Sequence, residues 1–260
     1  MSTPPKLGNT VPFKAFVEFL VYSNLIISFS AFTLSAGGAK IMGVVDYLEY
    51  GVFAFFATMF VYNVQRVISP KDKVLNPRLK WMYAHRRYVY FSLGISLFIS
   101  VFYFFRLMNG VNISVILFMC LPVFVSLLYV VRIGRRNLRE ISFVKTHSIA
   151  LSWTTVLFIF PFLNQEFFQL RVLLLFILPH YLYFLGVAAI FDVNDMKVDP
   201  LSQRTIPQLV GYQYTRNVAT VLLLISSVVI LYYKFSVLII LAICIQILLV
   251  RLVSDKRHHC

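Results

Sequence analysis

The sequence predicts an all-α membrane protein, a polytopic bundle of about eight transmembrane helices around a central cavity. The composition gives the first indication: the chain of 260 residues is 60% hydrophobic and only 13% charged, with a mean hydropathy of +0.81. These values are typical of polytopic membrane proteins and lie outside the range of soluble domains. The second is a series of apolar runs, each long enough to cross about 30 Å of hydrocarbon. The third is the regular alternation of long polar loops with short turns.

The apolar runs give the expected helices in order. The first follows a dozen polar residues and is a full-length span, so we expect it to act as the insertion signal and not as a cleaved signal peptide. The last two are separated only by the short link at Lys234, which we interpret as a tight hairpin. No Pro/Gly linker or low-complexity tract divides the chain, so residues 1–260 are expected to form a single domain. The eight runs cover about 13–35, 44–65, 88–105, 112–131, 146–163, 170–191, 216–233 and 235–253.

The distribution of positive charge predicts the orientation of the chain. The net charge is +14, yet 24 Lys and Arg residues cluster in alternate loops and at the termini, with four exceptions. This pattern follows the positive-inside rule and does not indicate nucleic-acid binding. Both termini and the long loops of about 66–87, 132–145 and 192–215 are therefore expected on the cytoplasmic face, where we place the active surface. The expected location is a bacterial cytoplasmic membrane. The four exceptions are Lys40, Arg106, Arg171 and Lys234.

Three aspartates, Asp192, Asp195 and Asp199, follow the sixth apolar run. At helical spacing they fall at i, i+3 and i+7, on a single face, where three anions repel one another unless a cation lies between them. Because they directly follow an apolar run, these carboxylates are expected where the membrane meets the cytosol. Carboxylates there suit Mg²⁺, which binds proteins through a few carboxylates together with substrate phosphates. A phosphorylated lipid is the expected partner. The alternative is a solvated helix end balanced by Lys197 and Arg204.

The order of residues from 192 to 211 resembles the second aspartate motif of the UbiA superfamily of membrane prenyltransferases. This resemblance implies transfer of a prenyl group from a prenyl diphosphate to a lipophilic acceptor in the membrane. It also implies that Asp192, Asp195 and Asp199 bind Mg²⁺ and act in catalysis, with Arg204 contacting the phosphates. The matching residues are Asp192, Asp195, Asp199, Arg204, Thr205, Pro207 and Gly211.

The first aspartate motif of that superfamily is degenerate in this chain. Of the segment expected after the second helix, Asn63 matches, whereas Val64, Val67 and Lys71 stand where the superfamily has aspartates. Half of the usual metal clamp is therefore missing. Arg66, with Lys71 and Lys73, can instead neutralise a diphosphate directly, since arginine forks onto phosphate oxygens and lysine acts as a point charge. The positive-inside rule alone also accounts for a basic loop at this position.

Further candidates for substrate binding lie in other segments. Tyr129 and Arg132, after the fourth run, resemble a tyrosine and basic residues of the same superfamily, and Lys145 is a weaker candidate of this kind. Asn24 and His180 are polar residues inside apolar runs, where polar side chains are costly, and we expect them to line the cavity. A histidine hydrogen-bonded to a neighbouring helix is the alternative for His180.

Two functions therefore remain open. One is an enzyme, a UbiA-like prenyltransferase with Mg²⁺-assisted ionisation of the donor. The other is a catalytically impaired UbiA-like protein that binds an isoprenoid or phospholipid without turnover, because the first motif lacks its carboxylates. A small-solute transporter is disfavoured, since the chain lacks the intramembrane charges and Gly/Pro-broken helix pairs of such proteins. No obligate protein partner is inferred, and the acceptor, whether a quinone precursor, a sugar, a haem or a lipid, is left open.

Overall fold

The structure is a computed structural model that describes residues 12–68, 77–108, 144–163, 173–196 and 205–233, together with isolated helical positions at 113–124 and 245. Among these residues nearly all backbone is helical and none is in a strand, as the sequence predicts. The chain divides into two compact units. The first unit contains Met1–Ile41 and Val45–Asn109, and the second contains Met42–Val44 and Gly110–Cys260. The single domain expected from the sequence stays a prediction.

Within the described residues, five helices are long and apolar enough to cross a membrane, and a sixth span is formed if one bent helix pair crosses as a unit. The predicted helix over 13–35 is wrong as a single rod, because it consists of α1 (Pro12–Tyr22) and α2 (Leu25–Ile41), which are bent by 61°. The expected helices over 112–131 and 235–253 lie largely outside the described residues. The eight spans, the central cavity and the cytoplasmic termini remain predictions.

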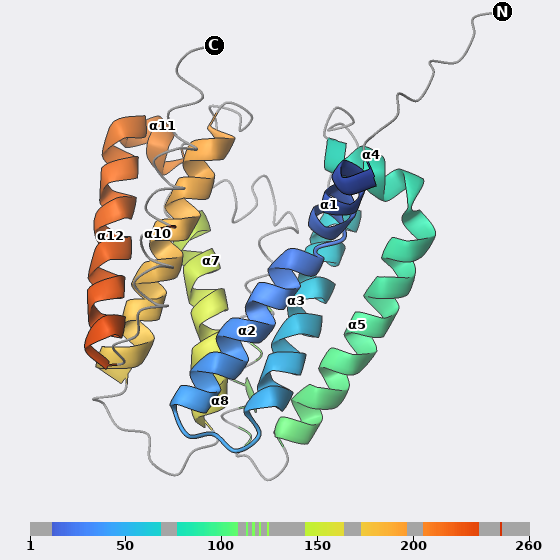
Figure 1. The fold of residues 1–260 in the computed structure, drawn as a ribbon, viewed down its shortest axis with the longest axis horizontal. Helices are drawn as coiled ribbons and strands as arrows, with labels where there is room; N and C mark the ends of the chain where they lie inside the picture. Colours follow the sequence, from blue (N-terminus) through green and yellow to red (C-terminus); the bar gives the residue numbers. More distant parts are fainter. Residues whose placement is uncertain are drawn as a thin grey trace, which may run out of the picture. The chain divides into compact units, whose positions relative to one another are not determined.

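In the first unit, α3 (Tyr47–Ile68) packs against both α2 and α5 (Arg86–Leu107), while α4 (Pro77–Ala84) lies at one end beside α1 (Figure 1). Small side chains form much of the buried surface of α2 and α5, as is usual between membrane helices because they allow close backbone approach. On α5 the buried serines recur every four residues, so they share one face. The buried small residues are Ser28, Ala31, Ser35, Ala36, Gly38 and Ala39 on α2 and Ser92, Ser96 and Ser100 on α5.

Replacing Gly51 of α3 with alanine is expected to destabilise the first unit by about 1–3 kcal/mol, because overpacking forces neighbouring groups apart. A Cβ atom at Gly51 would lie 2.9 Å from Cβ of Ala36 and 3.0 Å from the ring of Phe32. The matched control is Gly94→Ala on α5, where no atom lies within 4 Å of the added Cβ. Thermal unfolding in detergent measures both, and equal losses would contradict the close α2–α3 contact.

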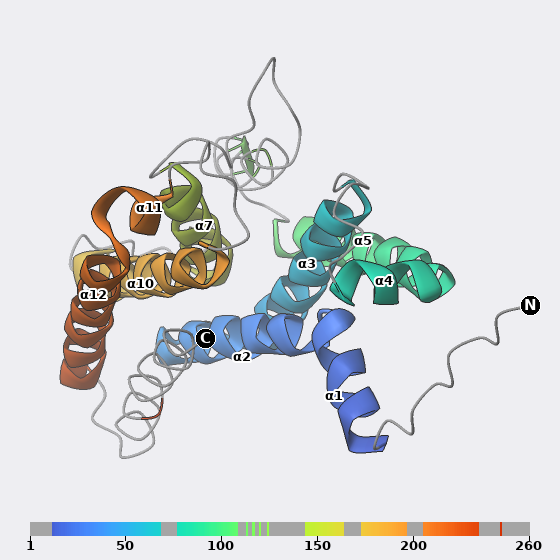
Figure 2. The same cartoon turned by 90° about the horizontal axis from the view of Figure 1, so that it is seen from above.

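In the second unit, α10 (Leu178–Asp195) packs between α7 (Val144–Thr154) and α12 (Tyr212–Tyr233), as seen from above in Figure 2. The helix begun by α7 continues through a π-helical turn, η3 (Thr155–Ile159), into α8 (Phe160–Leu163). A second π-helical turn, η4 (Leu173–Ile177), leads into α10. Buried Phe158 and Phe160 fill the core of this unit. Its packing brings the start of α7 to the end of α10, where the acidic segment begins.

Candidate functional site

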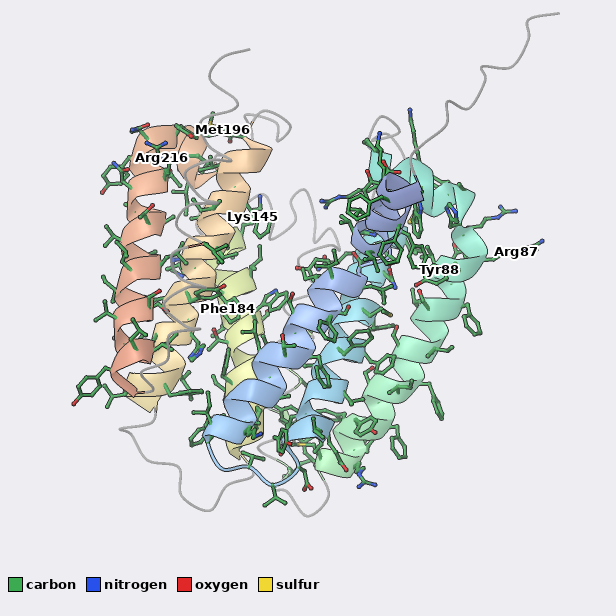
Figure 3. The ribbon with its side chains drawn as sticks, viewed as in Figure 1. Arg87, Tyr88, Lys145, Phe184, Met196 and Arg216 are labelled. Carbon is green, nitrogen blue, oxygen red and sulfur yellow. The ribbon has the colours of Figure 1, made fainter. Side chains whose placement is uncertain are left out.

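The side chain of Asp192 is held by a pair of residues from α7. Lys145 Nζ lies 2.6 Å from Asp192 Oδ1, and the Thr146 hydroxyl donates a hydrogen bond of 2.9 Å to Asp192 Oδ2. The Asp192 and Lys145 side chains are only 2% and 7% exposed. Figure 3 labels Lys145, and Asp192 lies one helical turn before Met196, the residue directly after α10. Both carboxylate oxygens of Asp192 are therefore engaged.

This arrangement follows from helix direction and burial. Because α7 and α10 are neighbours and Lys145 and Thr146 belong to the first turn of α7, these residues meet the last turn of α10. A buried carboxylate is strongly disfavoured unless it is paired and hydrogen-bonded. The ammonium of Lys145 supplies the charge and Thr146 supplies the second hydrogen bond. These two contacts fix the position of Asp192 at the end of α10, and the acidic segment with Asp195 and Asp199 follows it in the sequence.

The carboxylate of Asp192, a predicted Mg²⁺ ligand, is paired with a cation of the chain itself. An ammonium at 2.6 Å already balances its charge, and the residues described in the structure contain no group of three acidic, histidine or cysteine side chains arranged to hold a metal. Asp195 is the last residue of α10. Its side chain, and all of Asp199 and Arg204, lie outside the described residues. Magnesium binding therefore stays a prediction for all three aspartates.

The residues that follow the acidic segment form a capped turn. The Thr205 N–H donates to Gln208 Oε1 over 3.0 Å at the start of α11 (Ile206–Val210), and Pro207 occupies the first turn, where its missing N–H costs nothing. Gly211, between α11 and α12, has φ +88°, a conformation that favours glycine. Its N–H donates to the Pro207 carbonyl at 3.1 Å. Thr205, Pro207 and Gly211 thus have a local structural role.

Asn24 and Asn63, both predicted to bind substrate, lie together in the first unit and bind one another. Asn24 Nδ2 donates to Asn63 Oδ1 at 2.8 Å, and Asn63 Nδ2 donates to the Ser92 hydroxyl at 3.1 Å. Ser92 in turn donates to the Val89 carbonyl at 2.9 Å. Both asparagines are 2% exposed. This buried chain of hydrogen bonds joins the break between α1 and α2 to α3 and α5.

Arg66 also stabilises the break between α1 and α2. Its guanidinium donates to the carbonyl of Tyr22, the last residue of α1. The final carbonyls of a helix have no partner within the helix, so this contact caps α1. A guanidinium has five N–H donors, so contact with a phosphate is compatible with this capping bond and stays a prediction.

His180 lies among aromatic rings next to the two π-helical turns. Its Nδ1 is 2.6 Å from the carbonyl of Phe176, one turn earlier in the same helix. The ring is 3.9 Å from that of Phe158 and 4.6 Å from that of Phe176, measured between centroids. The hydrogen bond to Phe176 stays within one continuous helix, whereas the alternative drawn from the sequence was a hydrogen bond to a neighbouring helix. A role for His180 in binding substrate stays a prediction.

No family model, curated protein or solved structure matches the chain. The resemblance to the UbiA superfamily therefore depends on residues 192–211 and on the looser similarity at Tyr129 and Arg132, which lie outside the described residues.

Sequence reasoning missed Thr146 and Ser92 as partners of the predicted site residues. Serine and threonine are common in membrane helices, and nothing in the sequence separates these two from the others. For Ser92 a weak signal exists, since Ser92, Ser96 and Ser100 repeat at the spacing of one helix face. Lys145 was recognised only as a possible phosphate contact, and its pairing with Asp192 requires knowledge of which helices are neighbours.

Proposed function

We propose that the protein is a UbiA-like membrane prenyltransferase, which moves a prenyl group from an allylic diphosphate to a lipophilic acceptor. One observation carries the proposal: Asp192 is buried and held by Lys145 and Thr146 at the end of α10. The segment with Asp195 and Asp199 starts from this fixed point and leads into the turn at Thr205. Buried, paired charges in a membrane helix are costly and generally mark functional sites.

The residues of the chain have distinct parts in this reaction. Lys145 balances Asp192, so Asp192 orients the end of α10 and does not bind the donor. Arg204 and Arg132 contact the diphosphate oxygens, since guanidinium groups pair well with phosphate. Magnesium bound at Asp195 and Asp199 would take up charge on the diphosphate as the allylic C–O bond breaks. The bonding electrons leave with the diphosphate, and a nucleophile of the acceptor then attacks the allylic carbon and loses its proton.

A second function is favoured by the contacts in the first unit. At the position of the first aspartate motif, Asn63 is hydrogen-bonded to Asn24 and Ser92, and Arg66 caps α1. Val64 and Val67 have no atoms that bind a metal. These contacts support a protein that binds an isoprenoid or phospholipid without turnover.

A transfer assay distinguishes the two functions. The purified protein is incubated with radiolabelled allylic diphosphates of several chain lengths and a lipid extract as the acceptor pool, in Mg²⁺ or in EDTA. We expect a prenylated lipid product that forms only with Mg²⁺. Binding of the donor without release of diphosphate supports the second function, and absence of both binding and product contradicts the two proposals together.

The Asp195→Asn variant is expected to lose transfer activity by about 100-fold, the scale on which removal of one charge-stabilising group slows catalysis. The change keeps the size of the side chain and removes its negative charge. Asp46→Asn is the matched control, because Asp46 lies in the first unit at an exposed position. Unchanged activity in Asp195→Asn, measured in the same assay, would exclude Asp195 from the site.

A further inference from the structure

We propose that α1 and α4 together form a membrane-surface platform that binds anionic lipid headgroups. The platform consists of α1, α4 and the exposed basic residues at the start of α5. All of these elements belong to the first unit. The proposal is independent of the prenyltransferase activity and concerns a different part of the chain.

The bend between α1 and α2 turns α1 away from the direction of the span. The two helices meet at 61°, and Asn24 in the break has φ +66°. Hydrogen bonds from Asn24 to Asn63 and from Arg66 to the Tyr22 carbonyl hold this geometry. The 17 residues of α2 extend about 25 Å at 1.5 Å per residue, which is most of the hydrocarbon thickness. With α2 as the spanning part, α1 lies at the membrane surface, oblique to the bilayer normal.

The outer side of α1 has the pattern of an interfacial helix. Phe13, Phe16 and Val17, at i, i+3 and i+4, are 73%, 57% and 39% exposed and form an apolar stripe. Lys14 and Glu18 lie to the other side of the helix at its 100° step per residue. A helix with an apolar stripe next to charged residues lies in the plane of the membrane interface, with the stripe buried at the boundary of headgroups and acyl chains.

The inner side of α1 packs on aromatic residues of α4 and α5. The ring of Phe19 is 6.0 Å from that of Trp81 and 5.5 Å from that of Tyr88, and the ring of Tyr22 is 6.2 Å from that of Trp81. Trp and Tyr are enriched at membrane–water interfaces, where their amphipathic rings sit at the level of the headgroups. This contact fixes which side of α1 is free, so that the stripe of Phe13, Phe16 and Val17 is the side available to lipid.

Exposed cations are adjacent in sequence to two of these rings, since Lys80 precedes Trp81, and Arg86 and Arg87 precede Tyr88. Lys80, Arg86 and Arg87 are exposed, and none of the three has an ion-pair partner in the described part of the chain. Figure 3 shows Arg87 extending away from the helices of the first unit. Along α1, α4 and the first turn of α5, Glu18 is the one acidic residue of the sequence. Basic residues at this level attract anionic headgroups. A lipid surface satisfies both the apolar stripe and the cations, whereas an acidic protein or nucleic acid would leave the phenylalanines in water.

Thermal unfolding in lipid nanodiscs tests the proposal. Nanodiscs contain phosphatidylcholine alone or with added phosphatidylglycerol, and Trp153→Phe leaves Trp81 as the single tryptophan, which reports on the first unit. We expect phosphatidylglycerol to raise the melting temperature by about 3 °C or more, and the variant with Lys80, Arg86 and Arg87 all changed to Gln to lose this rise. Lys40→Gln, an exposed cation at the other end of α2, keeps it. An equal melting temperature in both lipids, or an unchanged rise in the triple variant, would overturn the proposal.

The position of the apolar stripe is tested separately. In a protein with both tryptophans changed to Phe, a new tryptophan is introduced by Phe16→Trp, and its fluorescence is measured in lipids brominated near the headgroup or near the acyl-chain end. Stronger quenching by the shallow bromines is expected. Absence of quenching, or stronger quenching by the deep bromines, contradicts an interfacial α1.

Discussion

Lys145→Met is expected to destabilise the second unit by about 3–5 kcal/mol, the cost of removing one partner of a buried ion pair. Methionine fills a similar volume but leaves the carboxylate of Asp192, which is 2% exposed, without its cation. The measurement is equilibrium unfolding in mixed micelles, followed through the fluorescence of Trp153 in a Trp81→Phe background. Trp153 lies on α7, the helix that carries Lys145, and contacts Phe184 of α10.

The double variant Lys145→Met/Asp192→Leu is the control for this effect. Replacing both partners of a buried pair with apolar residues of similar size is often neutral, so most of the lost stability should return. Lys40→Met, at an exposed position in the first unit, should cost little. Wild-type stability in the single variant, or a double variant less stable than the single one, would show that the pair does not hold Asp192.

Asn24→Ala is expected to cost the first unit about 2–5 kcal/mol. Asparagine is one of the few residues that tolerate a left-handed conformation such as φ +66°, whereas alanine pays about 1–2 kcal/mol for it. The change also removes the donor to the buried Asn63, and an unsatisfied buried group costs about 1–3 kcal/mol. Unfolding is followed through Trp81 in a Trp153→Phe background, because Trp81 contacts both Phe19 and Tyr22 of α1.

Asn24→Gly separates the two contributions. Glycine adopts positive φ without strain but lacks the amide that donates to Asn63, so Asn24→Gly should lose less stability than Asn24→Ala. Equal losses of stability in the two variants would mean that the backbone at residue 24 leaves the left-handed conformation when the asparagine is replaced. A larger loss for glycine would contradict the conformation of Asn24.

Hydropathy predicted the helical class and the spans that became α3, α5 and α12, because long apolar runs have few alternatives in a membrane. It missed the break at Asn24, since the run over 13–35 is apolar on average and the left-handed φ of one asparagine leaves no trace in hydropathy. It also missed α4. In the loop of 66–87, basic residues next to Leu79 and Met82 keep the hydropathy low, so the sequence does not indicate that these two side chains form the buried side of a short helix.

The candidate site was predictable in its residues but not in their pairing. The three aspartates stand out because acids are rare in this chain. The positive-inside rule accounts for Lys145 as a loop charge, and only the packing of α7 on α10 shows that it meets Asp192. In the same way, Asn24 and Asn63 were recognised as polar residues in apolar runs, but their hydrogen bond depends on a contact between residues 39 positions apart.

Equilibrium binding of radiolabelled farnesyl diphosphate to the protein in nanodiscs tests most directly whether the acidic segment holds a magnesium–diphosphate donor. We predict saturable binding in Mg²⁺ that weakens by about tenfold or more, about 1.4 kcal/mol of binding free energy, in EDTA and in the Asp195→Asn variant. The variant should keep the wild-type melting temperature. Affinity that is equal in Mg²⁺ and EDTA, and unchanged in Asp195→Asn, would contradict a metal-dependent diphosphate site at these aspartates.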